Sequence, residues 1–298
     1  MYDQATDNSL RELDSRTKDQ QPIVNMYEDE IKGYIHQVWE SSDPSWFPGP
    51  QPISIERKHF KVLKSQPYVV CEKTDGVRHM LVCFETSDKK KICALVDRAF
   101  HVTYTTLTVP RDTVLDGELM DNIFYVYDAV RVKGEDVRKK TLTERLSQAK
   151  AVVKSILKQP KLQVKVKEML PLSEVSKIQL GEKTDGLIFT PIEEPVRIGT
   201  HETLFKWKPR HLITIDFLVM NGKDLCIQER GALRKEAELN VRTRPYAPGT
   251  ILECDYNELG WTPVKERPDK KHPNNRRTYD RTIVNLRENI KVDEFYSL

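Results

Sequence analysis

The sequence contains few cysteines and no cysteine motif, which argues against two ways of stabilising a small protein. The five cysteines form no Cys-x-x-Cys pair, and most of them stand in short apolar segments. This distribution favours buried thiols in a reducing compartment over a zinc site or a disulfide framework. The seven histidines show no metal-ligand spacing, so we expect no structural metal site.

The sequence also lacks a long apolar run. No stretch approaches the roughly 20 residues that span a bilayer, and the start, MYDQATDNSLRELDS, lacks the apolar core of a signal peptide. We therefore predict no membrane association.

The net charge of the chain is only +3, which is too small to indicate a nucleic-acid partner by itself. With 31% charged and 38% hydrophobic residues in 298, the composition is that of a globular protein with one large or two smaller domains.

One string of five residues, EKTDG, occurs twice, in CEKTDGVRHM (71–80) and in GEKTDGLIFT (181–190). Asp-Gly is a turn signal, because glycine tolerates the backbone conformations of tight turns. YVVC (68–71) and HMLVCF (79–84) flank the first copy like two short strands, so we expect a hairpin there. A charged turn of this kind needs no function, and we attribute the repetition itself to chance.

Local patterns predict the elements before and between the two copies. Residues 1–22 are polar and aperiodic and predict a loose arm. Thr141 and Glu144 form a capping box that begins a helix ending near residue 158. The other expected elements are a helix at 27–39, a proline-rich extended connector at 44–52, a short helix at 57–64, and strands at 91–96, 114–120, 123–130, 162–169 and 204–208.

Beyond Pro209 the pattern changes to short strands separated by turns that contain glycine or asparagine. The expected strands are LITIDFLVM (212–220), DLCIQ (224–228), TILECDY (250–256) and WTPV (261–264). Such a series is typical of a small barrel or sandwich. We therefore predict two domains, 1–211 and 212–298, with a terminal helix near 283–290 that packs back on the first domain.

Charged and aromatic residues follow these strands in a fixed order. The segments are KTDGVR (73–78), DGEL (116–119), YVYDAV (125–130), TDGLIF (184–189), LFKWKP (204–209), IDF (215–217) and WTPVKERPDKKHPN (261–274). The ordered set resembles the covalent nucleotidyltransferases, the superfamily of ATP-dependent ligases and messenger RNA capping enzymes. KTDGVR, the upstream FPGPQPISIER and the terminal Trp…Arg-x-Asp-Lys…Pro-Asn segment are similar to the capping guanylyltransferase branch. The resemblance covers about residues 47–275.

This resemblance implies a fold and a reaction. The fold is α+β: a nucleotidyltransferase domain of the ATP-grasp-like ligase and capping type, with antiparallel sheets and helices, followed by an OB-fold β-barrel. The reaction is the transfer of GMP from GTP, through a lysine–GMP intermediate, to the 5′-diphosphate end of RNA. An ATP-dependent polynucleotide ligase that uses the same lysine, and a non-catalytic RNA-binding OB protein, are the alternatives.

Lys73 matches the nucleophile of the family, because it alone is followed by Asp75, Gly76 and Arg78 in the K-x-D-G-x-R pattern. The second copy lacks the arginine, and there Asp185 matches a carboxylate while Lys183 is incidental. A lysine must be neutral to attack phosphorus, so cations should lie nearby.

The resemblance also implies a set of GTP-binding residues. They are Glu72, Arg78, Glu118, Tyr127, Lys167, Asp185, Lys206, Lys208, Asp216, Lys265, Arg267, Asp269 and Lys270. Glu118 and Asp185 would hold Mg²⁺ or Mn²⁺. Lys206 and Lys208, on one face of one strand, would contact the α-phosphate. Lys265 stands where the family has an arginine. A single ammonium charge therefore replaces a planar guanidinium group that can form two parallel hydrogen bonds.

Simpler interpretations exist for several of these residues. Tyr127 stands where the family stacks an aromatic ring on the purine, but it is also compatible with a plain core position. Trp207 and Trp261 fit packing better than base stacking. The segment RPDKKHPNNRR (267–277) suits either a solvated basic loop or a contact with RNA phosphates.

The resemblance further implies partners and a location. We expect RNA 5′-diphosphate ends as acceptor, and the RNA polymerase II C-terminal tail as a partner. Because only some 45 residues precede the resemblance, we also expect a separate RNA 5′-triphosphatase. The expected location is the nucleus, or the cytoplasm if the protein is viral.

Overall fold

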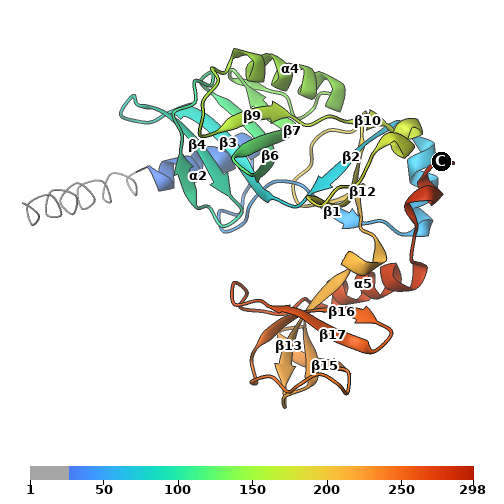
Figure 1. The fold of residues 1–298 in the computed structure, drawn as a ribbon. Helices are drawn as coiled ribbons and strands as arrows, with labels where there is room; N and C mark the ends of the chain where they lie inside the picture. Colours follow the sequence, from blue (N-terminus) through green and yellow to red (C-terminus); the bar gives the residue numbers. More distant parts are fainter. Residues whose placement is uncertain (1–26) are drawn as a thin grey trace, which may run out of the picture. The chain divides into compact units, whose positions relative to one another are not determined.

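The computed structural model describes residues 27–298, so the loose arm predicted at 1–22 lies outside the described residues. The described chain folds as two compact units (Figure 1). The first unit comprises the described residues up to Gln51 with Gly76–Glu168 and Ile192–His201, and the second comprises Pro52–Asp75, Met169–Pro191 and Glu202–Leu298. The domain boundary between 211 and 212 stays a prediction.

The first unit is built on one large sheet. Its strands have the order β5-β4-β3-β6-β7-β8, all antiparallel, and β9 joins β7 in parallel. Their bounds are β3 Val77–Glu85, β4 Lys91–Asp97, β5 Val102–Tyr104, β6 Thr113–Met120, β7 Ile123–Val132, β8 Glu135–Asp136 and β9 Gln163–Val166.

Both faces of this sheet are covered, because successive side chains of a strand point to opposite faces. In β3, Met80 and Val82 pack in the cluster that contains helix α2, Glu28–Trp39. Leu81 and Cys83 pack in the other cluster, with helix α4, Leu142–Ser155. The predicted helices at 27–39 and after Thr141 are therefore confirmed.

The second unit contains most of a smaller sheet of order β1-β12-β11-β2-β10, in which β12, β11, β2 and β10 are antiparallel neighbours. The bounds are β1 Gln51–Ser54, β2 Tyr68–Thr74, β10 Leu170–Pro171, β11 Thr184–Pro191 and β12 Thr200–Trp207, with η1 Arg57–His59, α3 Phe60–Ser65 and η2 Leu172–Lys177 nearby in the sequence. Val70, Phe189 and Phe205 are fully buried in its core.

The hairpin predicted at the first EKTDG is wrong. Strand β2 ends at Thr74 and pairs with β11 and β10, whereas β3 begins at Val77 and pairs with β4 and β6. The edges of β2 are occupied by strands that come later in the sequence. Asp75 and Gly76 therefore form the passage from one sheet to the next.

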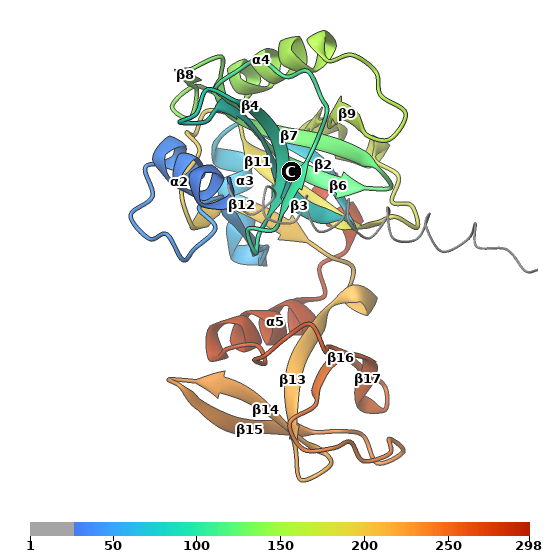
Figure 2. The ribbon, with the colours of Figure 1, turned by 90° about the vertical axis from the view of Figure 1, so that its left-hand side faces the viewer.

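The C-terminal strands form a five-stranded antiparallel sheet of order β15-β14-β13-β16-β17 (Figure 2). Their bounds are β13 Thr214–Met220, β14 Asp224–Glu229, β15 Ala232–Glu238, β16 Ile251–Asn257 and β17 Gly260–Glu266. The two edges meet, because Leu239 forms a parallel bridge with Trp261 and the Asn240 amide donates to the Trp261 carbonyl at 2.9 Å. The sheet thus closes into the expected small barrel, and the α+β fold class is confirmed.

After the barrel, the chain forms helix α5, Arg276–Glu288, and the 3-10 turn η4, Val292–Phe295. Leu286 packs in the barrel core, whereas Ile290 and Phe295 pack in the core of the sheet that contains β2. The Trp207 indole donates to the Ile290 carbonyl at 2.9 Å. Trp207 is therefore a packing residue, as its simpler interpretation predicted, and η3, Arg210–Leu212, directly follows its strand.

Candidate active site

The two EKTDG copies lie side by side in the structure. Strands β2 and β11 are antiparallel neighbours, with Thr74 opposite Thr184 and Lys73 opposite Gly186. The Asp75 amide donates to the Lys183 carbonyl at 3.0 Å and extends the pairing past the end of the strand. The two copies, whose repetition was attributed to chance, therefore build one structural feature together.

The register of this pair is irregular at Asp185, which stands between Thr184 and Gly186 without a partner residue of its own. Such a bulge re-aims a side chain. The Lys73 Nζ donates to Asp185 Oδ1 at 2.8 Å and to Oδ2 at 3.1 Å. Lys208 Nζ lies 2.8 Å from the same Oδ2. One carboxylate therefore holds two lysines, and we call Lys73, Asp185 and Lys208 the lysine–aspartate triad.

Gly186 is the residue that allows this arrangement. A Cβ atom built at Gly186 would lie 1.8 Å from the carbonyl oxygen of Trp207, the register neighbour of Leu187 on β12. No side chain fits there, because real Cβ contacts are never that short. The glycine thus permits the close backbone approach that brings Lys208 to Asp185.

The charge of Asp185 is stabilised by its partners. Burial alone would raise the pKa of the carboxyl group, but hydrogen bonds from Lys208 and Lys73 outweigh burial, and the pKa lies below its ordinary value. The Lys73 side chain keeps 24% of its surface exposed. The amine is therefore held in place and still accessible to a ligand.

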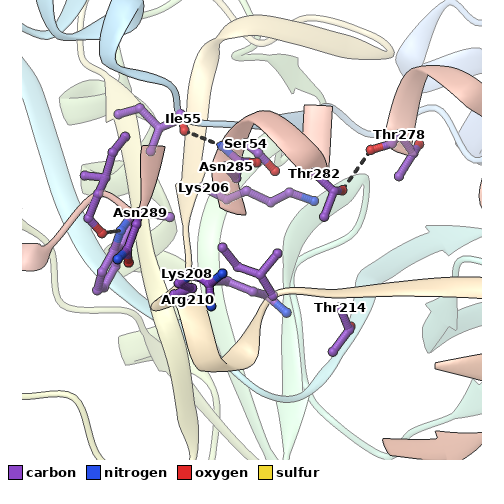
Figure 3. Close-up of a pocket in the computed structure, with 13 residues that line it drawn as sticks. Ser54, Ile55, Lys206, Lys208, Arg210, Thr214, Thr278, Thr282, Asn285 and Asn289 are labelled. Carbon is purple, nitrogen blue, oxygen red and sulfur yellow. Dashed lines mark hydrogen bonds between the residues drawn. The ribbon is translucent and has the colours of Figure 1, made fainter. Parts of the chain in front are cut away.

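A cavity of about 160 Å³ opens beside β12 (Figure 3). Its thirteen lining residues include Lys206, Lys208 and Arg210 and no carboxylate. The Lys206 side chain extends across the cavity toward the Thr282 hydroxyl of α5. Three cations with nearby hydroxyl and amide groups suit an anionic ligand such as a phosphate group.

The sequence predicts that Lys206 and Lys208 lie within one strand. Lys206 lies in β12, but Lys208 lies one residue beyond its end, so the prediction holds for Lys206 alone.

In the first unit, Arg78 is the centre of a second group. Its guanidinium donates to Asp116 at 3.1 and 2.6 Å and to the Pro50 carbonyl at 2.6 Å. The same guanidinium lies over the rings of Phe47 and Tyr127, at 5.3 and 5.9 Å from their centroids. Arg78 therefore connects the proline-rich connector, β6 and the ring of Tyr127.

Glu118 and Tyr127 belong to the strands beside Arg78. Glu118 is the register partner of Arg78 on β6. A Cβ atom at Gly76 would lie 2.8 Å from Glu118 Cγ, so the glycine leaves room for that side chain. Burial raises the pKa of Tyr127 well above its ordinary value, although Arg78 opposes the shift. Lys167 follows β9, and its amide donates to the Val126 carbonyl at 2.7 Å.

The basic segment after β17 is paired with acids of the barrel. Arg267 lies 3.3 Å from both Asp216 and Glu253 and 2.8 Å from Asp269. Lys270 forms an ion pair with the same Asp216. These contacts lower the pKa of Asp269 to about 2, chiefly through its hydrogen bond from Arg267. Arg267 and Lys270 are thus paired with acids of the barrel and its following loop.

Lys265 and Glu72 complete the predicted set. Lys265 lies 3.5 Å from Glu253, the register partner of Asp216. Glu72 precedes Lys73 on β2 and lies opposite Leu187 of β11.

Sequence reasoning missed Asp116 and Glu253. Asp116 stands two residues before Glu118, so strand periodicity places both carboxylates on one face of β6. Glu253 could be found by the same rule, as a polar residue that interrupts an apolar strand. The partner of Asp116, Arg78, lies 38 residues away on β3, and the partner of Glu253, Arg267, lies 14 residues away, directly after β17.

Within residues 27–298, no three His, Cys, Asp or Glu side chains are grouped so that they could hold one ion. Magnesium commonly binds through one or two carboxylates together with substrate phosphates. Asp185 and Glu118 are each a single carboxylate that suits this mode, in which the nucleotide supplies the remaining ligands.

Two family models match this chain. A family model described as the catalytic domain of the mRNA capping enzyme matches residues 16–210. A second model, the C-terminal domain of the mRNA capping enzyme, matches residues 212–296. The chain therefore belongs to the mRNA capping enzyme family.

Curated relatives carry the same description. The alpha subunit of the mRNA-capping enzyme of Schizosaccharomyces pombe is 32% identical over 218 residues, which is 60% of this chain and 54% of that protein. The mRNA-capping enzyme of Mus musculus is 26% identical over 292 residues, which is 82% of this chain and 48% of that protein. The chain thus spans about half the length of these relatives.

Among solved structures, a mycobacterial DNA ligase D complexed with ATP and MES is similar, with a TM-score of 0.44 and 13% identity. The match covers 74% of this chain and 96% of the ligase chain. No helix within residues 27–298 is long and apolar enough to cross a membrane.

Proposed function

We propose that this protein is an mRNA guanylyltransferase that transfers GMP from GTP, through Lys73, to the 5′-diphosphate end of RNA. The observation that carries the proposal is the lysine–aspartate triad: a strand lysine, accessible and held by a carboxylate that a second lysine shares. Membership of the capping enzyme family supports the choice of GTP and RNA.

In the first half-reaction, the Lys73 amine attacks the α-phosphorus of GTP. A nitrogen–phosphorus bond forms, the bond to the β-phosphate oxygen breaks, and pyrophosphate leaves. Asp185 is hydrogen bonded to the amine and can accept the proton that the amine must lose. Lys208 and Lys206 stabilise the charge on the α-phosphate oxygens. In the second half-reaction, the RNA diphosphate displaces Lys73 and takes the GMP.

Other residues bind the rest of GTP. Tyr127 stacks on guanine and Lys167 contacts the guanine carbonyl. Glu118 binds the ribose or the metal. Arg78 lies over the ring of Tyr127 and supports it. Arg78 and Glu72 each contact the nucleotide.

A divalent ion, Mg²⁺ or Mn²⁺, held by the phosphates with Asp185 and Glu118, would neutralise phosphate charge when bound.

The basic segment grips the β- and γ-phosphates during the first half-reaction. Arg267, Asp269 and Lys270, with Asp216 and Lys265, form a charged group on the barrel. Arg267 and Lys270 must exchange the carboxylate of Asp216 for phosphate oxygens to do so. This exchange is a gating step that must be reversed before RNA reaches the lysine-bound GMP.

The proposed reaction implies partners and a location. The acceptor is an RNA with a 5′-diphosphate, which a separate RNA 5′-triphosphatase would produce. Binding to the RNA polymerase II C-terminal tail and action in the nucleus follow from the same role. A cytoplasmic location would apply to a viral enzyme.

Labelling with radioactive nucleotide tests the proposal. The purified chain, incubated with Mg²⁺ and α-labelled GTP, should acquire a covalent label that pyrophosphate removes. Labelling by ATP in place of GTP would instead make the protein an ATP-dependent ligase. Absence of any covalent label with either nucleotide would leave a non-catalytic RNA-binding protein.

A further inference from the structure

Residues 145–167 carry seven lysines and arginines and no aspartate or glutamate. Because the whole chain has a net charge of only +3, the rest of the chain is net negative. Five of these lysines are exposed and have no role in the reaction described above. They are Lys150, Lys154, Lys158, Lys161 and Lys165, here called the lysine patch.

The lysine patch runs along one edge of the first unit, where β9 is the edge strand. In α4, Ala149 and Val152 are buried in the core, whereas Lys150 and Lys154 lie one turn apart on the exposed face. In β9, alternate valines pack on the same core and leave Lys165 exposed. Helix α4 packs beside β9 (Figure 1). Because the β9 valines face α4, Lys165 points to the opposite face of the sheet, and the patch runs from that face round the edge strand β9, through the loop, to the exposed side of α4.

Within the described residues, no carboxylate forms an ion pair with a lysine of the patch. The basic segment of the barrel differs, since Arg267 and Lys270 are already paired with Asp216. Arg145, also in the segment 145–167, is buried 2.7 Å from Asp128. An outside polyanion can therefore bind the lysine patch without displacing an internal acid.

We propose that the lysine patch binds the phosphodiester backbone of the RNA acceptor, downstream of its 5′ end; this proposal rests on the proposed function. Lysine ammonium groups are point charges, which suit a chain of diffuse phosphate charges, whereas phosphopeptides are bound mainly through arginine forks. The location agrees, because Lys165 lies opposite Tyr125 on β7, the strand that carries Tyr127. The patch thus begins beside the strand proposed to bind guanine.

The chemistry of the patch also predicts how RNA would bind. Residues 145–167 contain no aromatic side chain, so base stacking cannot contribute. Binding should be independent of sequence and should weaken steeply with salt, because it releases counterions from the phosphates. These properties suit an enzyme that acts on every transcript.

The test compares two double variants of the full chain. Lys150→Gln with Lys154→Gln removes two charges from the patch, and Lys61→Gln with Lys64→Gln removes two exposed charges from α3. A third variant replaces all five patch lysines by glutamine. Fluorescence anisotropy measures the Kd for a long single-stranded RNA at several salt concentrations, which requires no activity. Single-turnover transfer from preformed enzyme–GMP is measured with a long and a dinucleotide 5′-diphosphate acceptor.

We expect the five-lysine substitution to raise the Kd for long RNA by about tenfold or more. The slope of the logarithm of the binding constant against the logarithm of the salt concentration should become less steep by about 0.7 for each lost phosphate contact. The α4 double variant should lie between it and the wild type, and the α3 double variant should match the wild type. Transfer to the dinucleotide and formation of the enzyme–GMP adduct should not change.

Three results would overturn the proposal. They are an unchanged Kd for RNA in the five-lysine variant, a loss of RNA affinity in the α3 double variant equal to that in the α4 double variant, or patch-dependent binding of a phosphoserine peptide without binding of RNA. If the wild type bound RNA through the patch but formed no adduct with GTP, the guanylyltransferase assignment would be wrong. The proposal that the lysine patch binds RNA would still hold.

Discussion

The two EKTDG copies have identical letters and different structural roles. In the first copy, Lys73 lies in regular pairing within β2, and Asp75 and Gly76 lead the chain into the next sheet. In the second copy, the strand is bulged at Asp185, and the aspartate side chain reaches Lys73. The same string therefore presents its lysine in one copy and its carboxylate in the other.

The difference arises from the neighbours of each copy. Gly186 is pressed against the Trp207 carbonyl of β12, which fixes the bulge. Gly76 instead faces Glu118 and the Leu119 carbonyl of β6. A short sequence motif is thus insufficient to assign a residue role, because the strands that pair with it decide which side chain faces the ligand.

The largest expected effect separates the two lysines. Lys73→Ala should abolish the enzyme–GMP adduct, because it removes the attacking nitrogen. Lys183→Ala, the matched substitution in the second copy, should leave adduct formation largely intact. Gel labelling with α-labelled GTP measures both, and the reverse pattern would exchange the roles of the copies.

The next effect concerns the carboxylate of the second copy. Asp185→Asn keeps the shape but loses the charge that holds Lys73 and Lys208, so adduct formation should fall by about a hundredfold, the usual scale for a preorganised charge. Glu182→Gln, an exposed acid in the same copy, is the control and should have little effect. Lys208→Ala should resemble Asp185→Asn. Equal rates of adduct formation for Asp185→Asn and Glu182→Gln would show that Asp185 has no role in the reaction.

A smaller effect tests the bulge itself. Gly186→Ala forces a Cβ atom against the Trp207 carbonyl and should lower the free energy of unfolding by about 1–3 kcal/mol. Gly181→Ala has open space around the new atom and should be tolerated. Urea unfolding of both variants provides the measurement. A Gly186→Ala protein as stable as Gly181→Ala would mean that the two strands can separate locally without cost.

The smallest effect is a pH dependence. Because the folded pKa of Asp185 lies below its ordinary value, its ion pairs stabilise the fold above the unfolded pKa of about 3.9, and this stability is lost as pH falls through the folded pKa. The free energy of unfolding should therefore be larger for the wild type than for Asp185→Asn near neutral pH, and this difference should vanish in acid. A difference that persisted at a pH below the folded pKa of Asp185, where the carboxyl group is protonated in both states, would show that Asp185 stabilises the fold by another route.

Much of the fold could be predicted from local patterns, since helix α2, the capping box at Thr141 and four barrel strands have strong signals. Strand β15 was missed because Ala232–Glu238 is mostly exposed and charged, as befits an edge that packs on little. The hairpin was predicted wrongly at Asp75 because pairing between β2 and β11 depends on residues over a hundred positions apart.

The candidate site divides in the same way. Resemblance to a family supplied Lys73, Asp185 and Lys208, which the structure brings together. It could not supply Asp116, the partner of Arg78, or Glu253, the partner of Arg267, because each pair depends on how two neighbouring strands align. The sequence also gave no sign that Arg267 and Lys270 would be neutralised by Asp216.

The central claim is that, of the two identical strings, the first carries the nucleophile and the second the carboxylate. The most direct test is mass spectrometry of peptides from the wild-type protein after incubation with GTP and Mg²⁺. We predict GMP on Lys73, in the peptide that contains CEKTDGVR, and none on Lys183. GMP found on Lys183, or divided equally between the two lysines, would contradict the account.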